Sequence, residues 1–160
     1  MTEAFDYSAA VISRNGREHH CFGCGTLNDS GLQLAFRRGP AGVWAELRPD
    51  RRYEGYVGMV HGGMLSAMLD EAMSWAITAG GDFAVTARLN ISFRAPARIG
   101  ALLRVEGRVE AIQRRLIITA ATVTDVDADT VIADAEGRFM RVSAEQAALW
   151  QQEYIRTDGA

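Results

Sequence analysis

The sequence predicts an α+β fold in which a single antiparallel sheet wraps around one long central helix. Residues 64–77 form a helical stretch that is apolar almost all round, and such a helix belongs in the interior of a domain. Segments that are typical of strands lie on both sides of it, two before and four after. One apolar helix needs a curved sheet around it, and a single sheet covers only one side. We therefore also expect self-association.

The first two strands are expected at Leu32–Phe36 and Val43–Leu47. The turn formers of residues 39–42 lie between them, so the two segments are interpreted as a hairpin. Residues 19–31 are rich in turn-forming types and indicate a loop. Residues 1–18 have a mixed composition, which indicates a short helical or irregular lead-in.

The central helix is expected to follow a polar loop over residues 49–58 and to include Met64–Ile77. Gly80 and Gly81 end it, because glycine readily adopts the backbone conformation found just beyond a helix. The polar side chains of the helical stretch are few: Ser66, Asp70, Glu71 and Ser74.

After this helix the hydrophobic period changes to two, which is typical of strands with one buried face. Short turns separate the segments, so we expect a meander of successive antiparallel strands. The expected strands are Val85–Phe93, Leu103–Ala111, Leu116–Asp125 and Val131–Val142. Ser143 is an N-cap residue type and opens a last helix, expected at about residues 144–155.

Composition excludes several classes of protein. A chain of 160 residues suits one domain, here expected over residues 1–160, with a core at about 20–142. A net charge of −3 offers no basic field for nucleic acid, and no apolar stretch reaches the length that spans a membrane. The chain begins without a secretory signal pattern and contains two cysteines, which favours a reducing compartment, the cytoplasm.

The helix carries a narrow polar stripe around Asp70. An unpartnered carboxylate is costly on a buried helix, and Ser66 and Ser74 lie one turn before and after it on the same face. His61–Gly63 directly precede the helix, and the two glycines let the backbone approach a ligand closely. The first N–H groups of a helix lack partners inside it, so this end favours an oxygen that carries negative charge.

Three segments together resemble a known family. They are His61–Gly63 followed nine residues later by Asp70, the strand Thr86–Ala97, and the Cys-Phe-Gly-Cys-Gly segment within Cys21–Leu32. Over roughly residues 20–142 the chain resembles the hotdog-fold acyl-CoA thioesterases of the PaaI-like group. The resemblance implies a hotdog fold, hydrolysis of an acyl-CoA thioester, and no cofactor.

The resemblance also assigns roles to individual residues. Asp70 falls on the catalytic acid, a general base or nucleophile, and Gly62 on the residue whose N–H polarises the thioester carbonyl. His61 falls on the family histidine, and Thr86 on a hydroxyl residue that positions the attacking water. Many relatives carry an asparagine shortly before the glycines, but residues 54–58 contain none, so that role is vacant or filled differently.

Spacing along the helix indicates that the site is shared between subunits. Asp70 and Gly62 are separated by roughly 12 Å at about 1.5 Å per residue, too far to act on one carbonyl. This agrees with the family arrangement, a site across a dimer interface, so we expect a homodimer or a dimer of dimers.

The residues expected to bind the substrate are Gly63, Ser66, Glu71, Asn90, Arg94 and Arg98.

Two other functions stay open at this level. A non-catalytic module that binds or senses acyl-CoA is one, although pure binding has little use for a buried acid. The other is a hotdog dehydratase or hydratase that uses Glu71, which points about 100° away from Asp70 around the helix. His61 is expected to orient its turn by hydrogen bonding rather than to transfer protons.

A zinc site is an alternative interpretation of the loop at residues 19–31, called the first loop below. His19, His20, Cys21 and Cys24 have near-ligand spacing. A single Cys-x-x-Cys without a second pair is a weak signal, and adjacent histidines rarely both bind a metal. The sequence therefore predicts no metal, and a buried loop that covers the sheet or the site.

Overall fold

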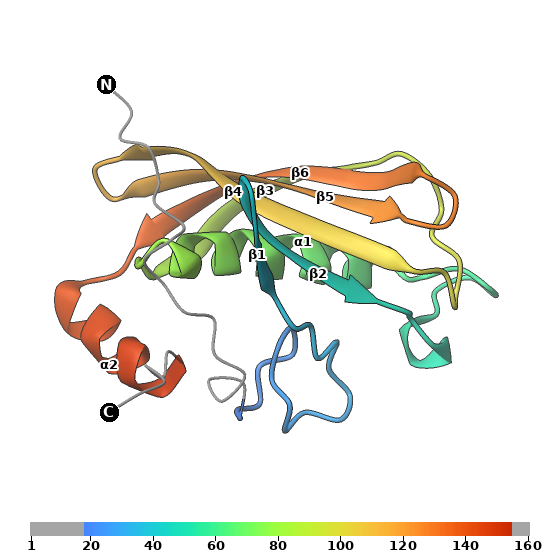
Figure 1. Cartoon of the computed structure of the whole chain (residues 1–160), viewed down its shortest axis with the longest axis horizontal. Helices are drawn as coiled ribbons and strands as arrows, with labels where there is room; N and C mark the ends of the chain where they lie inside the picture. Colours follow the sequence, from blue (N-terminus) through green and yellow to red (C-terminus); the bar gives the residue numbers. More distant parts are fainter. Residues whose placement is uncertain (1–17, 155–160) are drawn as a thin grey trace.

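The structure is a computed structural model that describes residues 18–154, so the lead-in expected over residues 1–18 lies almost entirely outside the described residues. A 3-10 turn at Arg51–Tyr53 and two helices accompany six strands (Figure 1). The helices are α1 (Gly62–Ala79) and α2 (Ala144–Tyr154), and the strands are β1 (Arg37–Gly39), β2 (Gly42–Leu47), β3 (Ala84–Phe93), β4 (Leu103–Gln113), β5 (Leu116–Asp125) and β6 (Thr130–Arg141).

All six strands form one antiparallel sheet, in the order β1-β2-β4-β5-β6-β3, and α1 lies across one face of it (Figure 1). This is the predicted hotdog architecture. The expected meander of four strands is wrong in one respect, because only β4, β5 and β6 are consecutive neighbours. The strand β3 pairs with β6 at the edge of the sheet, while β4 pairs with β2. Alternation along each strand marks its buried face but does not determine its neighbour.

The first predicted strand is displaced along the chain. Leu32, Leu34 and Phe36 are buried as their alternation indicates, but the paired strand β1 begins only at Arg37. The N–H of Leu32 donates to the carbonyl of Phe22, and the N–H of Leu34 donates to that of Gly23. These backbone groups are therefore held by the preceding loop rather than by β2.

Close packing of α1 on the sheet depends on two glycines. A Cβ at Gly107 in β4 would collide with the backbone carbonyl of Ala72, and one at Gly137 in β6 would collide with the Met73 side chain. Ala72 and Met73 are fully buried there. The face of α1 that meets the sheet consists of Leu65, Met68, Leu69, Ala72, Met73 and Ala76, all buried.

The opposite face of α1 is less covered than the sequence predicts. Ser66, Ala67, Asp70 and Ser74 are only half-buried within the single chain. The helix is therefore not enclosed on all sides, because one sheet covers one face and nothing in the described part of the chain covers this stripe completely. We call these four residues the α1 stripe.

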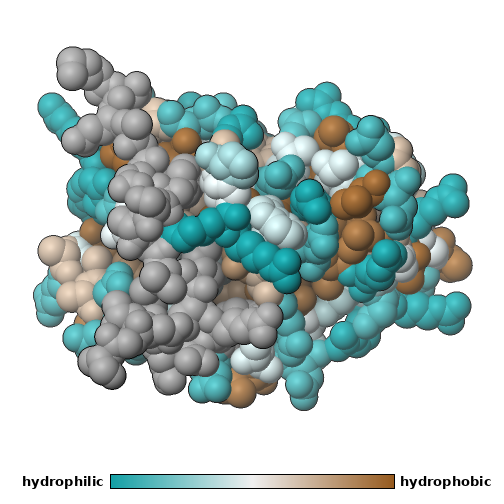
Figure 2. Space-filling model, in the orientation of Figure 1, coloured by the Kyte–Doolittle hydropathy of each residue, from teal (hydrophilic) through white to brown (hydrophobic). Residues whose placement is uncertain are grey.

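The surface is mostly hydrophilic in the view of Figure 2, with apolar patches among the charged residues. Several large apolar side chains are exposed: Tyr56, Val57, Val85 and Phe93. No helix within residues 18–154 is long and apolar enough to cross a membrane.

Candidate active site

The structure brings Asp70 on α1 together with Thr86 on β3. The Thr86 hydroxyl donates a hydrogen bond of 2.7 Å to Oδ1 of Asp70. Thr86 is exposed and stands at a register irregularity between β3 and β6, a local feature that can redirect a side chain. Because the hydroxyl donates its proton to the carboxylate, its oxygen lone pairs remain able to accept a hydrogen bond from water.

The start of α1 is held by His61. Its Nδ1 accepts a hydrogen bond of 2.8 Å from the N–H of Gly63, which makes His61 the N-cap of the helix. The backbone N–H of His61 donates to the carbonyl of Tyr53. The sequence-based expectation that this histidine orients its turn is therefore met in the geometry.

The N–H of Gly62 stays available at the same helix end. Among the hydrogen bonds of residues 18–154, none uses this N–H, although the neighbouring N–H of Gly63 is occupied by His61. The carbonyl of Gly62 accepts from the Ser66 hydroxyl at 2.8 Å. A free N–H at a helix N-terminus can stabilise a developing negative charge on an oxygen.

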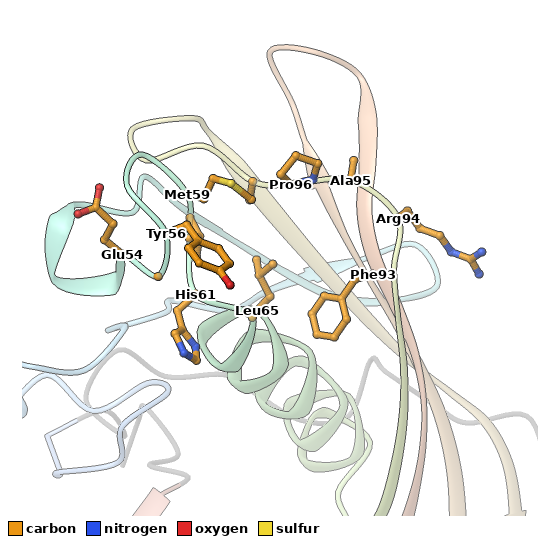
Figure 3. A pocket seen from close by; sticks show the side chains of 13 residues that line it. Glu54, Tyr56, Met59, His61, Leu65, Phe93, Arg94, Ala95 and Pro96 are labelled. Atoms are coloured by element: carbon orange, nitrogen blue, oxygen red, sulfur yellow. The ribbon is translucent and has the colours of Figure 1, made fainter.

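A pocket of about 810 Å³ opens beside this helix end. In Figure 3, Tyr56 and Phe93 lie on either side of Leu65, and His61 lies at the start of the helix below them. The lining comes from the loop before α1, from the first turn of α1 and from the end of β3. The pocket is therefore large enough for part of a small organic substrate, next to the Gly62 N–H.

Two of the residues expected to bind the substrate, Arg94 and Arg98, lie around this pocket. Arg94 lines it, extends away from its centre in Figure 3, and pairs with Asp134 at 2.6 Å. Arg98 is exposed, and its backbone bridges to Met59 of the lining. The charge of Arg94 is thus partly compensated within the chain.

Two further residues of the predicted site, Asn90 and Gly63, lie at exposed positions. Asn90 is exposed on β3, where its register partner is Glu136 on β6. Gly63 is exposed in the first turn of α1. Because β3 has a neighbour on one side only, its outer edge is unpaired within the described sheet.

Glu71 is covered by other side chains. The indole N–H of Trp75 donates to its Oε1 at 3.1 Å, and the Cys21 Sγ lies 3.8 Å from both carboxylate oxygens. Burial, followed by the nearby Cys21, raises the pKa of Glu71 to about 7. Sequence reasoning missed Trp75, although its position four residues after Glu71 places both on one side of the helix.

The two cysteines beside Glu71 differ in their ionisation. A hydrogen bond from the Cys24 thiol lowers the pKa of Cys21 to about 5. The same hydrogen bond, together with burial, raises the pKa of Cys24. The first loop therefore lies against the carboxylate of Glu71 through Cys21.

Comparison with known proteins finds similarity to one superfamily. The family model described as thioesterase superfamily matches residues 57–132. The acyl-coenzyme A thioesterase THEM5 of Mus musculus is 30% identical over 104 residues, which are 65% of this chain and 42% of that protein. The chain spans about two fifths of the length of the curated relatives it matches.

Solved structures share the fold. A putative thioesterase from Ralstonia eutropha, described as a phenylacetic acid degradation-related protein, is 29% identical with a TM-score of 0.61, over 68% of this chain and 85% of that one. A protein from Streptococcus mutans, solved bound to acetyl-CoA, is 19% identical with a TM-score of 0.65, over 78% and 98%. Together these comparisons show that the chain has the hotdog fold of these thioesterases, and that residues 57–132 are similar in sequence to the thioesterase superfamily.

Proposed function

We propose that the protein hydrolyses an acyl-CoA thioester to the free acid and CoA. The observation that carries the proposal is the hydrogen bond between Thr86 and Asp70. It joins the two residues that the family resemblance assigns to the acid and to the positioning of water, although they lie on different elements. The curated relatives named as acyl-coenzyme A thioesterases and the acetyl-CoA bound by the Streptococcus mutans protein support this substrate class.

In the proposed reaction Asp70 acts as general base or nucleophile. As a base it takes a proton from a water that also donates a hydrogen bond to the Thr86 oxygen, and the water oxygen attacks the thioester carbonyl carbon. As a nucleophile its carboxylate forms an anhydride that water then hydrolyses. In both routes the carbonyl oxygen becomes negatively charged beside the Gly62 N–H, and the C–S bond breaks as the CoA sulfur leaves and takes up a proton.

The site is proposed to form between two subunits. Asp70 of one subunit would act with Gly62 of the partner subunit, because about 12 Å separates the two positions along one helix. The half-buried α1 stripe and the unpaired edge of β3 support an interface on this side of the sheet. A homodimer, alone or within a dimer of dimers, would cover both.

The pocket beside Gly62 is proposed to bind the substrate. Its apolar lining, with Tyr56, Leu65 and Phe93, suits the less polar part of an acyl-CoA. Arg94 and Arg98 at its border are the proposed phosphate contacts, since guanidinium groups bind phosphates with two parallel hydrogen bonds. Neither Cys21 nor Cys24 forms a disulfide, which suits a reducing compartment, and the cytoplasm is the proposed location.

The alternative functions receive less support. Dehydration by Glu71 requires an accessible carboxyl, yet this group is covered by Trp75 and by the loop that carries Cys21. A binding module would not require an acid that is oriented by a hydroxyl donor.

A hydrolysis screen tests the proposal directly. The purified protein is incubated with short, long and aromatic acyl-CoAs, and released CoA thiol is measured. We expect turnover of at least one class that is lost in Asp70→Asn. Binding of acyl-CoA without any release of thiol would instead assign the sensing function.

A further inference from the structure

A second cluster of chemically reactive side chains is distinct from the Asp70–Thr86 pair. Cys21 and Cys24 come from the first loop, and Glu71 comes from α1. One ligand atom from each lies within 4.8 Å of the others. The proposed hydrolysis uses none of these three groups. They meet only in the folded chain, because 50 positions separate Cys21 from Glu71.

The loop is shaped to close on the carboxylate. The Cys21 sulfur accepts hydrogen bonds from the backbone N–H groups of Gly23 and Cys24, and the N–H of Gly25 donates to the Cys21 carbonyl at 2.9 Å. A Cβ at Gly23 would collide with the carboxylate of Glu71, and one at Gly25 would collide with the backbone of the loop itself. Both glycines are therefore required for the approach, and the tight turn presents the two sulfurs on the same side.

The distances within the cluster approach those of a metal site. Zinc binds cysteine sulfur at about 2.3 Å and carboxylate oxygen at about 2.0–2.2 Å, so neighbouring ligand atoms on a tetrahedral ion lie about 3.6–3.8 Å apart. The Cys21 Sγ is 3.8 Å from each oxygen of Glu71. The other pairs of ligand atoms in the cluster lie within 4.8 Å of one another. An inward movement of about an ångström would bring them to the spacing of a tetrahedral zinc site.

The surroundings of the cluster also fit a bound ion. The Trp75 indole N–H donates to one oxygen of Glu71, and metal-binding carboxylates are commonly oriented in this way by a hydrogen bond. A pocket of about 320 Å³ adjoins the cluster and leaves room for water. His19 lines this pocket, and its Nε2 is buried with no hydrogen-bond partner among the described residues.

We propose that Cys21, Cys24 and Glu71 bind one zinc ion, with water from the adjoining pocket in the fourth position. Two thiolates and a carboxylate form a donor set that suits zinc rather than calcium or magnesium. The ion fastens the first loop to α1 beside Asp70, because the same pocket is also lined by Ser74 and Thr86. Its role is structural, and no step of the hydrolysis passes through it. This proposal departs from the sequence-based expectation that the loop binds no metal.

The test measures metal binding by the full-length chain. The protein is purified under reducing conditions, stripped with a chelator and titrated with zinc, and then with cobalt as a spectroscopic probe. We expect one equivalent of zinc per chain, and a cobalt spectrum with sulfur-to-metal charge transfer and the intense visible bands of a tetrahedral site. Cys24→Ser should abolish stoichiometric binding, and Trp75→Phe should weaken it about 10–100-fold.

A matched pair of variants separates this site from the catalytic one. Glu71→Gln and Asp70→Asn make the same acid-to-amide change at neighbouring positions of α1. Glu71→Gln should lose stoichiometric zinc binding, whereas Asp70→Asn should retain it at the affinity of the parent protein. Because the readout is metal content, the result does not depend on whether the protein hydrolyses acyl-CoA.

Three outcomes would overturn the proposal. The first is a reduced parent protein that binds less than a tenth of an equivalent of zinc at micromolar concentrations. The second is unchanged zinc affinity in folded Cys24→Ser or Glu71→Gln. The third is a cobalt spectrum without sulfur charge transfer, accompanied by air oxidation of Cys21 and Cys24 to a disulfide, which would assign the pair to thiol redox chemistry instead.

Discussion

At the scale of single residues, Asp70 and Glu71 are adjacent acids with different surroundings. Asp70 accepts one hydrogen bond from Thr86 and lies on the half-covered α1 stripe. Glu71 lies beneath the first loop, beside Cys21 and the indole of Trp75. The rotation of about 100° per residue in a helix separates them, so one faces the proposed reaction and the other the loop.

The first prediction concerns Asp70. Asp70→Asn preserves the shape of the side chain but removes its basicity and most of its nucleophilicity. We expect kcat to fall by about 10²-fold or more, the usual scale for the loss of a general base, while substrate binding is largely retained. Steady-state kinetics and ligand titration measure the two effects, after thermal melting has shown that the variant folds. A folded dimer of this variant with near-parent turnover would refute the proposed mechanism.

The second prediction concerns the hydroxyl of Thr86. Thr86→Val keeps the branched shape and removes the donor to Asp70, a hydrogen bond to a charged group worth about 1.5–3 kcal/mol. If that bond acts mainly in the transition state, kcat falls by about 10–100-fold while KM changes little. Thr86→Ser retains a hydroxyl and should recover most of the rate. Equal rates for the valine and serine variants would remove the hydroxyl from the mechanism.

At the scale of elements, the contact between α1 and β4 requires a residue without a side chain. Ala72 packs against the sheet at Gly107, where a Cβ would collide with a backbone carbonyl. Backbone cannot move aside as a flexible side chain can, so this position tolerates glycine alone.

The third prediction follows from this contact. Gly107→Ala should lower the free energy of unfolding by about 1–3 kcal/mol, because the added methyl group overpacks the interface between helix and sheet. Gly39→Ala in β1 is the control, since a Cβ there first meets the side chain of Trp44 at 3.3 Å rather than backbone. Chemical denaturation of both variants measures the difference. Equal stability of the two variants would show that α1 lies farther from β4 than described.

At the scale of the whole molecule, two surfaces on one side of the fold are incompletely covered. The α1 stripe is half-buried, and β3 offers an unpaired strand edge with Val85 and Phe93 exposed. Strand edges and apolar side chains of this kind are typical of association surfaces. A second copy of the chain would cover both and bring a Gly62 N–H within reach of Asp70.

The fourth prediction tests this assembly. The parent protein should sediment as a dimer or a dimer of dimers at micromolar concentration. Ala67→Glu places a charge on the α1 stripe and should shift the protein toward monomer, with loss of hydrolysis although Asp70 and Thr86 are retained. Ala41→Glu, in the exposed turn between β1 and β2, is the matched control and should remain associated. A parent protein that is monomeric and fully active would contradict the shared site.

The sequence by itself determined the elements that rest on local pattern. The central helix, its glycine end and the strand Leu116–Asp125 follow from the hydrophobic period and from turn residues, which act over a few neighbouring positions. The sequence also singles out Asp70 as a candidate, because a carboxylate in an apolar helix is costly unless it has a partner.

Only the tertiary structure decided which distant groups meet. The displacement of β1, the place of β3 beside β6, the hydrogen bond from Thr86 to Asp70 and the closure of Cys21 over Glu71 all join segments that are far apart in the chain. The hydrophobic period and the composition indicate which face of an element is buried, but they do not indicate which other element it packs against. Pairing depends on which backbone donors and acceptors remain free once the whole chain has packed, and that is a property of the complete fold.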